Sequence, residues 1–554
     1  MTPVSTSTAT VDKDWWRGAV IYQIYPRSFQ DSNNDGVGDL KGITARLPHV
    51  ARLGADAIWI SPFFASPMKD FGYDVSNYTD VDPMFGTVAD FDALIAEAHR
   101  LGIKVMIDLV ISHTSDQHAW FAESRSSRIN PKSDWYVWSD PKPDGSPPNN
   151  WLSIFGGSAW AWDARRMQYY LHNFLTSQPD LNMHNPQVQD AVLDAARFWL
   201  KRGVDGFRLD TINFYFHDKQ LRDNPPLSPE RRNASTAPAV NPYNFQDHIY
   251  DKNQPENLEF LKRFRALLEE FPAIAAVGEV GDGQYGLEIV GQYTSGGDKM
   301  QMCYAFEFLA PEPLTPQVVA DTQAAFRAAA PEGWACWAFS NHDVVRHVSR
   351  WGAEVVDRQA FAKFLSAVLL TQRGSVCIYQ GEELGLTEAD IAFEDLQDPY
   401  GKEFWPEFKG RDGCRTPMVW DSLAHHAGFS NGETTWLPIP VEHSLNAVSV
   451  QDGKEGSVLE HYRRFLQFRR QFPALVKGDI AFHIVSDTQL AYSRLLDGQE
   501  VLCLFNMSPA EDRIALPDGE WDMLEGHGFE AGLDDAKAIL PGWGAAFALR
   551  RQTV

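Results

Sequence analysis

The chain has 554 residues, of which 44% are hydrophobic, so it can bury a large core and exceeds the usual size of one simple domain. Its formal net charge of -25 argues against a groove that binds the phosphates of nucleic acid and favours neutral or cationic partners. No apolar run reaches the length of a membrane span, the N-terminus lacks a signal-peptide pattern, and the five cysteines include no metal-type pair. We therefore expect a reduced, cytoplasmic protein that binds neither nucleic acid nor membranes.

Short apolar strands alternate with amphipathic helices over most of the chain. The predicted strands cover residues 20–26, 57–62, 104–111, 204–210, 273–280, 300–308, 334–340 and 375–381. Helical patterns lie between most of them, for example at 88–102, 187–203 and 257–271. This alternation implies parallel strands with right-handed crossovers, and eight such strands favour a closed (β/α)8 TIM barrel. An open doubly wound sheet is the competing topology.

The alternation is interrupted after the third and the eighth predicted strands. Residues 114–182 are too many for a strand–helix loop, so we expect a small inserted domain there. Residues 384–430 are irregular and rich in acids, proline and aromatic residues. From residue 477 the pattern alternates without helices, which predicts an antiparallel β-sandwich domain over 477–554. The barrel itself then comprises residues 1–113 and 183–476.

Four predicted strands run into ionisable side chains, which are Asp108 and His113, Arg208 and Asp210, Glu279, and His342 and Asp343. Any single one could be a solvated acid or a helix cap. Together they would project toward one mouth, because reactive groups of a (β/α)8 barrel lie at the C-terminal strand ends. Crowded carboxylates separate in pKa, so that one stays charged while another stays protonated. Cleavage of a glycosidic bond uses carboxyl groups in those two states.

Four strand-end motifs occur in the order "DLVISH" (108–113), "GFRLD" (206–210), "GEV" (278–280) and "SNHD" (340–343). In this order they resemble the motifs of glycoside hydrolase family 13, the α-amylase family, and the resemblance covers nearly the whole chain. The opening "VIYQIYPRSFQDSNNDGVGD", with "QPDLN" (178–182) and "GRDGCRTPMVW" (410–420), is similar to the bacterial exo-acting α-glucosidase and oligo-1,6-glucosidase branch.

The resemblance implies a role for each matching residue. Asp210 would be the nucleophile, Glu279 the acid and base, and Asp343 the stabiliser of the distorted sugar. The residues implied to bind substrate are Asp70, Tyr73, His113, Phe155, Phe174, Arg208, Thr211, His342 and Arg411. Among them, Asp70 and Arg411 would close the pocket and make the enzyme exo-acting. For Tyr73 and the two phenylalanines, plain core packing is the alternative.

The expected reaction is double displacement with retention, in which the two reacting carboxyl groups lie about 5–5.5 Å apart. It would release α-D-glucose from the non-reducing end of maltose and short malto-oligosaccharides, with sucrose and aryl glucosides as further candidates. Thr211 follows the nucleophile, and a small polar residue there is typical of relatives that prefer α-1,4 over α-1,6 linkages. Transglucosylation is expected as well. The alternatives are a transglucosylase, a sucrose isomerase, an endo-acting amylase and a non-catalytic relative with a membrane anchor. We expect a monomer or a homodimer.

The loop at 31–39 carries oxygen ligands at the spacing of a calcium loop, from Asp31, Asn33, Asp35, the Val37 carbonyl and Asp39. Gly42 stands where a calcium sensor needs glutamate, so a sensor is disfavoured. In the resembling glucosidases this loop binds a structural Ca²⁺ or Mg²⁺, which implies the same cofactor here and no organic one. An acid-rich turn without a metal is the alternative.

Overall fold

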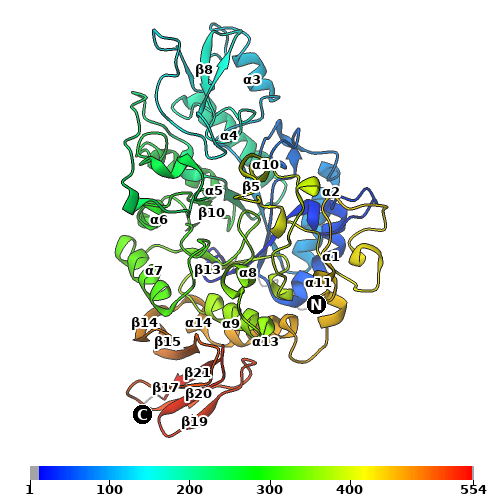
Figure 1. The fold of residues 1–554 in the computed structure, drawn as a ribbon, viewed down its shortest axis with the longest axis vertical. Coiled ribbons are helices and arrows are strands. Elements are labelled where there is room, and N and C mark those ends of the chain that lie inside the picture. Colours follow the sequence, from blue (N-terminus) through cyan, green and yellow to red (C-terminus); the bar gives the residue numbers. More distant parts are fainter. Residues whose placement is uncertain (1–11, 552–554) are drawn as a thin grey trace, which may run out of the picture.

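The centre of the molecule is a closed barrel of eight parallel strands, seen in a computed structural model that describes residues 12–551 (Figure 1). Residues 1–11, where no signal peptide is expected, and residues 552–554 lie outside the described part. The strands are β1 (Val20–Ile24), β2 (Ala57–Ile60), β5 (Lys104–Leu109), β9 (Gly206–Leu209), β10 (Ala275–Glu279), β11 (Met302–Tyr304), β12 (Cys336–Ala338) and β13 (Ser375–Tyr379). They pair in the order β11-β10-β9-β5-β2-β1-β13-β12, and a parallel bridge between Cys303 and Ala335 closes the ring. The predicted barrel is confirmed, and the open sheet is excluded.

The barrel strands are buried on both faces, as expected of parallel strands enclosed by helices. Ile21, Trp59, Met106, Val277 and Met302 pack together in one cluster of apolar residues, separate from the main core that contains the next residue along most of these strands. The alternation follows from the two-residue period of a strand, which sends successive side chains to opposite faces. All five cysteines are buried and unpaired.

Helices surround the barrel and begin or end where the local sequence predicts. The longer ones are α1 (Leu40–Leu53), α2 (Val88–Arg100), α4 (Pro186–Leu200), α5 (Asn257–Glu269), α6 (Gly286–Thr294), α7 (Pro316–Ala329), α9 (Arg358–Leu370) and α13 (Val458–Gln471). Thr87 and Asp90 form a capping box that starts α2, and Asn185 caps α4 just before Pro186. Within residues 12–551, none of the helices is long and apolar enough to cross a membrane.

Two further units, the segment between β5 and α4 and the C-terminal β unit, lie at opposite ends of the barrel (Figure 1). Between β5 and α4 the chain forms α3 (Ala119–Ser124) and a small sheet of β6 (Trp138–Ser139), β8 (Gln168–Leu171) and β7 (Trp160–Asp163). A two-stranded sheet of β3 (Phe64–Ala65) and β4 (Asn77–Val81) follows β2.

The C-terminal unit consists of two antiparallel sheets that share an apolar core, so the predicted C-terminal β fold is confirmed. The first sheet contains β14 (Asp479–Val485), β15 (Gln489–Leu496), β16 (Gln499–Asn506), β21 (Ala545–Arg550) and β18 (Trp521–Met523). The second contains β17 (Asp512–Ala515), β20 (Lys537–Leu540) and β19 (Gly532–Asp534). Five short helices complete the fold: α8 (His347–Gly352), α10 (Pro399–Phe404), α11 (Val441–Ser444), α12 (Val448–Gln451) and α14 (Pro473–Lys477).

Candidate active site

Strand register brings the ionisable residues into neighbouring positions at the C-terminal end of the barrel. Asp108 on β5 is directly opposite Arg208 on β9, and Glu279 on β10 is directly opposite Tyr304 on β11. Neighbouring residues in a parallel pair project to the same face of the sheet, so these side chains meet. Asp210 lies two residues beyond Arg208 and shares its face. The predicted convergence of strand-end acids is therefore present.

Arg208 is the centre of this group and is fully buried. Its Nη1 donates to Asp108 Oδ1 at 3.0 Å and to Asp210 Oδ1 at 2.5 Å, and its Nη2 lies 2.6 Å from Glu279 Oε2. One guanidinium thus serves three buried carboxyl groups. Because a single positive charge cannot balance three negative ones at low dielectric, at least one carboxyl group is driven to keep its proton.

Glu279 is the carboxyl group that retains its proton most readily. Burial raises its pKa to about 7, against the opposing effect of Arg208, and the charges of Asp210 and Asp343 act in the same direction as burial. Burial also raises the pKa of Asp210, to about 6, and Arg208 opposes that shift. Burial therefore raises both pKa values and leaves that of Glu279 the higher of the two. This order is the one that an ionised nucleophile beside a protonated acid requires.

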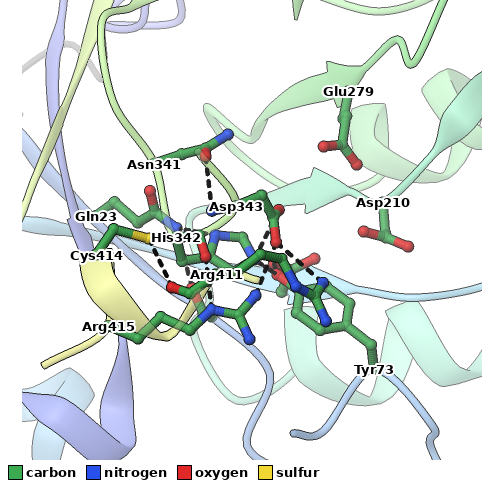
Figure 2. A network of polar contacts seen from close by, with 12 residues as sticks. Gln23, Tyr73, Asp210, Glu279, Asn341, His342, Asp343, Arg411, Cys414 and Arg415 are labelled. Atoms are coloured by element: carbon green, nitrogen blue, oxygen red, sulfur yellow. Dashed lines mark hydrogen bonds and ion pairs between the residues drawn. The ribbon is translucent and has the colours of Figure 1, made fainter. Parts of the chain in front are cut away.

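Asp343 follows β12 and lies among cationic and hydrogen-bonding groups (Figure 2). Arg415 Nη2 is 2.8 Å from its Oδ1, Arg411 Nη1 is 3.2 Å from the same oxygen, and His342 Nε2 is 3.2 Å from its Oδ2. Burial opposes ionisation, but His342 and the two arginines outweigh it and lower the pKa of Asp343. Burial lowers the pKa of His342 well below its usual value, so the ring is neutral and acts on Asp343 through its dipole and not through a full charge. The arginines supply the positive charge.

Asp70 and Arg411 form the ion pair that the family resemblance implies, with 2.9 Å between Oδ1 and Nη2. Arg411 also donates from Nε and Nη2 to the two oxygens of Asp398, at 3.0 and 2.8 Å. Gln178 Nε2 donates to Asp70 Oδ2 at 3.1 Å. Burial raises the pKa of Asp70 to about 6, although Arg411 opposes the shift. Arg411 thus contacts three carboxyl groups, those of Asp70, Asp398 and Asp343.

Tyr73 and the two predicted histidines are joined by hydrogen bonds. The ring of Tyr73 stacks on His342, with centroids 5.4 Å apart and planes 3° from parallel. Its hydroxyl lies 2.5 Å from His342 Nε2 and 3.2 Å from Asp108 Oδ2. His113 Nε2 is 2.9 Å from the Tyr73 carbonyl oxygen, which can only accept, and burial lowers the pKa of His113 to about 4. Both histidines are therefore neutral, and the role of Tyr73 as a platform for sugar stays a prediction.

Phe155 and Phe174 bring the inserted segment against the barrel. Their ring centroids are 6.0 Å apart, and both belong to an apolar cluster that includes Phe214 and Tyr400. The Arg411 guanidinium lies 5.2 Å from the centroid of Phe155. The two phenylalanines are 8% and 9% exposed and pack next to the candidate site, and their contact with substrate stays a prediction.

Thr211 contacts both candidate reacting carboxyl groups. Its backbone N–H donates to Glu279 Oε2 at 3.0 Å, and its hydroxyl donates to Asp210 Oδ2 at 3.2 Å. Its φ is +40°, a left-handed conformation that is costly for a β-branched residue. In this conformation the amide of Thr211 points toward Glu279.

The 31–39 loop, predicted to hold a hard cation, immediately precedes α1, and Asp39 caps that helix. Asp31 accepts hydrogen bonds from three backbone N–H groups of the loop, Asn33 from that of Asp35, and Asp35 from that of Val37. The donor set is entirely oxygen and suits Ca²⁺ or Mg²⁺ in its chemistry. Among residues 12–551, however, no three His, Cys, Asp or Glu side chains are grouped so that they could hold a metal ion. The cation stays a prediction.

Five residues of this site were not assigned from the sequence: Asp108, Gln178, Tyr304, Asp398 and Arg415. Asp108, Gln178 and Arg415 lie inside the quoted motifs, so their position was available without a role. Tyr304 is the last residue of its strand, a place where barrel side chains reach the mouth. Asp398 lies in the irregular segment after β13, where no periodicity indicates what it contacts.

Known proteins match this arrangement over almost the whole chain. The family described as alpha amylase, catalytic domain, matches residues 23–478. A probable alpha-glucosidase of Rhizobium meliloti (strain 1021) is 70% identical over 548 residues, which are 99% of each chain. An oligo-1,6-glucosidase of Heyndrickxia coagulans is 36% identical and covers 93% of this chain and 96% of its own. The crystal structure of XgtA, an alpha-glucosyl transfer enzyme, is 55% identical with a TM-score of 0.94, over 97% of this chain and 99% of its own. The chain therefore belongs to the α-amylase family of glycoside hydrolases, in its α-glucosidase branch.

Proposed function

We propose that the enzyme is a retaining, exo-acting α-glucosidase that prefers short α-1,4-linked substrates such as maltose. The observation that carries the proposal is the shared guanidinium of Arg208, which holds Asp210 at 2.5 Å and Glu279 at 2.6 Å. Two carboxyl groups on one guanidinium are held near each other, as direct attack by a carboxylate requires. Their pKa values of about 6 and about 7 suit a charged nucleophile beside a protonated acid.

In the first step of this mechanism, the carboxylate of Asp210 forms a bond to the anomeric carbon. Glu279 gives its proton to the glycosidic oxygen as the bond from that oxygen to the sugar breaks. In the second step Glu279, now a carboxylate, takes a proton from water, and the water oxygen displaces Asp210 from the sugar. Asp343, kept ionised by Arg411 and Arg415, stabilises the positive charge that develops on the ring in both steps.

The exo-action is supported by the Asp70–Arg411 pair, which is buried and anchored by Asp398 and Gln178. A pair braced on both sides can grip the outer hydroxyls of a terminal glucose and leave no passage for a longer chain. The apolar cluster of Phe155 and Phe174 lies against the same arginine. An endo-acting amylase would need this end of the site to be open.

The α-1,4 preference rests on Thr211, whose hydroxyl and amide contact the two reacting carboxyl groups. A larger apolar residue there would remove the hydroxyl contact and change the space beside the leaving sugar. Transfer of glucose to alcohols or phenols is supported by the likeness to an alpha-glucosyl transfer enzyme. A sucrose isomerase would use the same catalytic residues, and only its products would distinguish it.

The experiment is a timed product profile on maltose, isomaltose, sucrose, trehalose and starch, with the anomer of the first-released glucose read by NMR. The proposal expects α-glucose from maltose, little action on starch, and no isomerised disaccharide from sucrose. The β-anomer as first product would contradict retention. Asp210→Asn should abolish nearly all turnover, and near-normal turnover in that variant would contradict the nucleophile.

We also propose that the 31–39 loop binds a structural Ca²⁺ or Mg²⁺ through Asp31, Asn33, Asp35, the Val37 carbonyl and Asp39. Support comes from the all-oxygen donor set and from the position of the loop between β1 and α1. Such an ion would brace the first strand–helix connection and takes no part in the chemistry.

A further inference from the structure

Tyr304 lies in the centre of the active site, where the roles proposed so far do not use it. It ends β11 as the register partner of Glu279, and it is 5% exposed. Its hydroxyl oxygen is 2.8 Å from Nη2 and 3.2 Å from Nε of Arg208. The same oxygen is 3.2 Å from Oε1 of Glu279. One phenol therefore touches both the central guanidinium and the proposed acid.

The direction of these hydrogen bonds follows from the chemistry of the three side chains. An arginine guanidinium has only N–H donors, so the Tyr304 oxygen accepts from both nitrogens of Arg208. The single O–H of Tyr304 is then free to donate to Glu279 Oε1. The hydrogen bonds therefore run in one direction, from the Arg208 N–H groups to the Tyr304 oxygen and from the Tyr304 O–H to Glu279.

The two oxygens of Glu279 are consequently not equivalent. Oε2 accepts a hydrogen bond from the Thr211 amide at 3.0 Å and lies 2.6 Å from the positively charged Nη2 of Arg208. Within residues 12–551, the hydrogen bond that Oε1 accepts comes from the Tyr304 hydroxyl. A proton on Glu279 is therefore best placed on the free lone pair of Oε1. At Oε2 the proton would face the Arg208 guanidinium and the Thr211 amide.

We propose that Tyr304 is a positioning residue that fixes Oε1 of Glu279 as the oxygen that delivers and recovers the proton. The inference rests on the proposed role of Glu279 as acid and base. In the first step the proton moves from Oε1 to the glycosidic oxygen as the C1–O bond breaks and the bond from C1 to Asp210 forms. In the second step a water proton moves to Oε1 as the water oxygen bonds to C1 and Asp210 leaves. Tyr304 keeps its own proton throughout.

The hydrogen bond from Tyr304 strengthens when Glu279 becomes a carboxylate, because a charged acceptor binds a donor more strongly than a neutral acid does. Tyr304 therefore favours the state that follows proton delivery and makes Glu279 a stronger acid than burial alone would leave it. Other titratable and charged groups also face Glu279 or the Arg208 guanidinium beside it. They are Arg208 itself on β9, Asp210 directly after β9, Asp108 on β5, Asp343 after β12, and Tyr73. Removing only the Tyr304 hydroxyl leaves all of these in place.

The test is the pH dependence of kcat/KM in Tyr304→Phe, with Tyr293→Phe as the matched control. Tyr293 is also a buried tyrosine with one side-chain partner, Asn257, and it lies on α6 away from the reacting groups. In Tyr304→Phe the alkaline limb, which reports Glu279 in the free enzyme, should move upward by about one pH unit. The acid limb should move less, and the control should move neither limb. An alkaline limb that stays in place or moves downward in Tyr304→Phe would overturn the inference.

A second variant keeps the test decisive if Tyr304→Phe does not fold. Placing 3,5-difluorotyrosine at position 304 keeps the shape of the ring and makes the hydroxyl a stronger donor, so the alkaline limb should move downward. An unmoved limb in that variant would also overturn the inference. Failure of the proposed function is separable, because it would appear as turnover in Asp210→Asn or as inversion at the anomeric carbon. If those results agree with the mechanism and the limb stays in place, only the role of Tyr304 is wrong.

Discussion

Replacing Arg411 with methionine should destabilise the whole enzyme because it removes the guanidinium that pairs with the two buried carboxylates of Asp70 and Asp398. The Asp398 side chain is 0% exposed and the Asp70 side chain is 6% exposed, and both lie within 3 Å of Arg411. Asp343 would keep Arg415 at 2.8 Å, so its charge stays paired. Methionine fills most of the space left by the arginine stem, so the main effect is electrostatic.

Removing one partner of a buried ion pair lowers the free energy of unfolding by about 3–5 kcal/mol, because the remaining charge stays in low dielectric. Asp70 can escape part of that cost, since burial already raises its pKa to about 6 and the loss of Arg411 raises it further. Asp398 is less able to reduce this cost by taking up a proton. Although burial opposes it, Arg411 lowers the pKa of Asp398 in the native enzyme. A lowered folded pKa contributes stability above the unfolded pKa of about 4 and loses it as pH falls through the folded value. The deficit of Arg411→Met should therefore be largest at neutral and alkaline pH and shrink toward acid pH.

The assay is thermal unfolding at neutral and mildly acidic pH, compared as Tm because a chain with several structural units need not unfold in two states. Arg202→Met is the matched control, since Arg202 pairs with Asp92 where the side chains are 30% and 48% exposed. That pair should contribute no more than about 1 kcal/mol. The double variant Arg411→Met with Asp398→Asn should recover much of the lost Tm, because no unpaired charge then remains at position 398.

Two results would refute this reasoning. One is an Arg411→Met variant whose Tm falls no further than that of Arg202→Met. The other is a double variant no more stable than Arg411→Met alone, which would mean that the loss comes from packing and not from the stranded Asp398 charge.

The plot of kcat/KM against pH should be a narrow bell. It should fall below about pH 6 as Asp210 gains a proton and above about pH 7 as Glu279 loses one. A flat kcat/KM profile across this range would contradict the assignment. Glu279→Gln should slow maltose hydrolysis far more than the first step on activated aryl glucosides, which need less protonation, and equal losses in burst kinetics would argue against Glu279 as the acid. Thr211→Val should raise the ratio of kcat/KM for isomaltose over maltose, and an unchanged ratio would remove Thr211 from linkage selection. Chelation followed by dialysis should lower Tm and release about one Ca²⁺ or Mg²⁺ per chain if the 31–39 loop binds an ion, whereas no change in Tm or ion content would show it empty.

The barrel and its reactive acids could be predicted because both depend on local patterns. All eight predicted strands are present, with ends shifted by a few residues, since an apolar run bounded by a helical pattern reports a strand buried on both faces. The acids follow directly from those strand ends, so placing the strands also places Asp210 and Glu279. The order of the strand-end motifs then identified the family.

Contacts between distant segments could not be predicted in the same way. Asp70 and Arg411 are separated by 341 positions, and their pairing was expected only from the resemblance. The anchoring of Arg411 by Asp398 was not expected, because the irregular segment after β13 has no period from which a facing side chain can be inferred. The contact of Tyr304 with Glu279 depends on the register of two strands, which neither strand specifies alone.

The residue types at the ends of the barrel strands can be read from the sequence alone, because local periodicity and motif order carry that information. The sharing of one arginine, Arg208, by three carboxyl groups becomes apparent only in the folded chain, where burial also raises the pKa of Glu279 to about 7. The physical reason is that charge sharing and desolvation depend on which groups surround a side chain in space. The same glutamate at an exposed strand end would remain ionised at neutral pH and could not supply a proton.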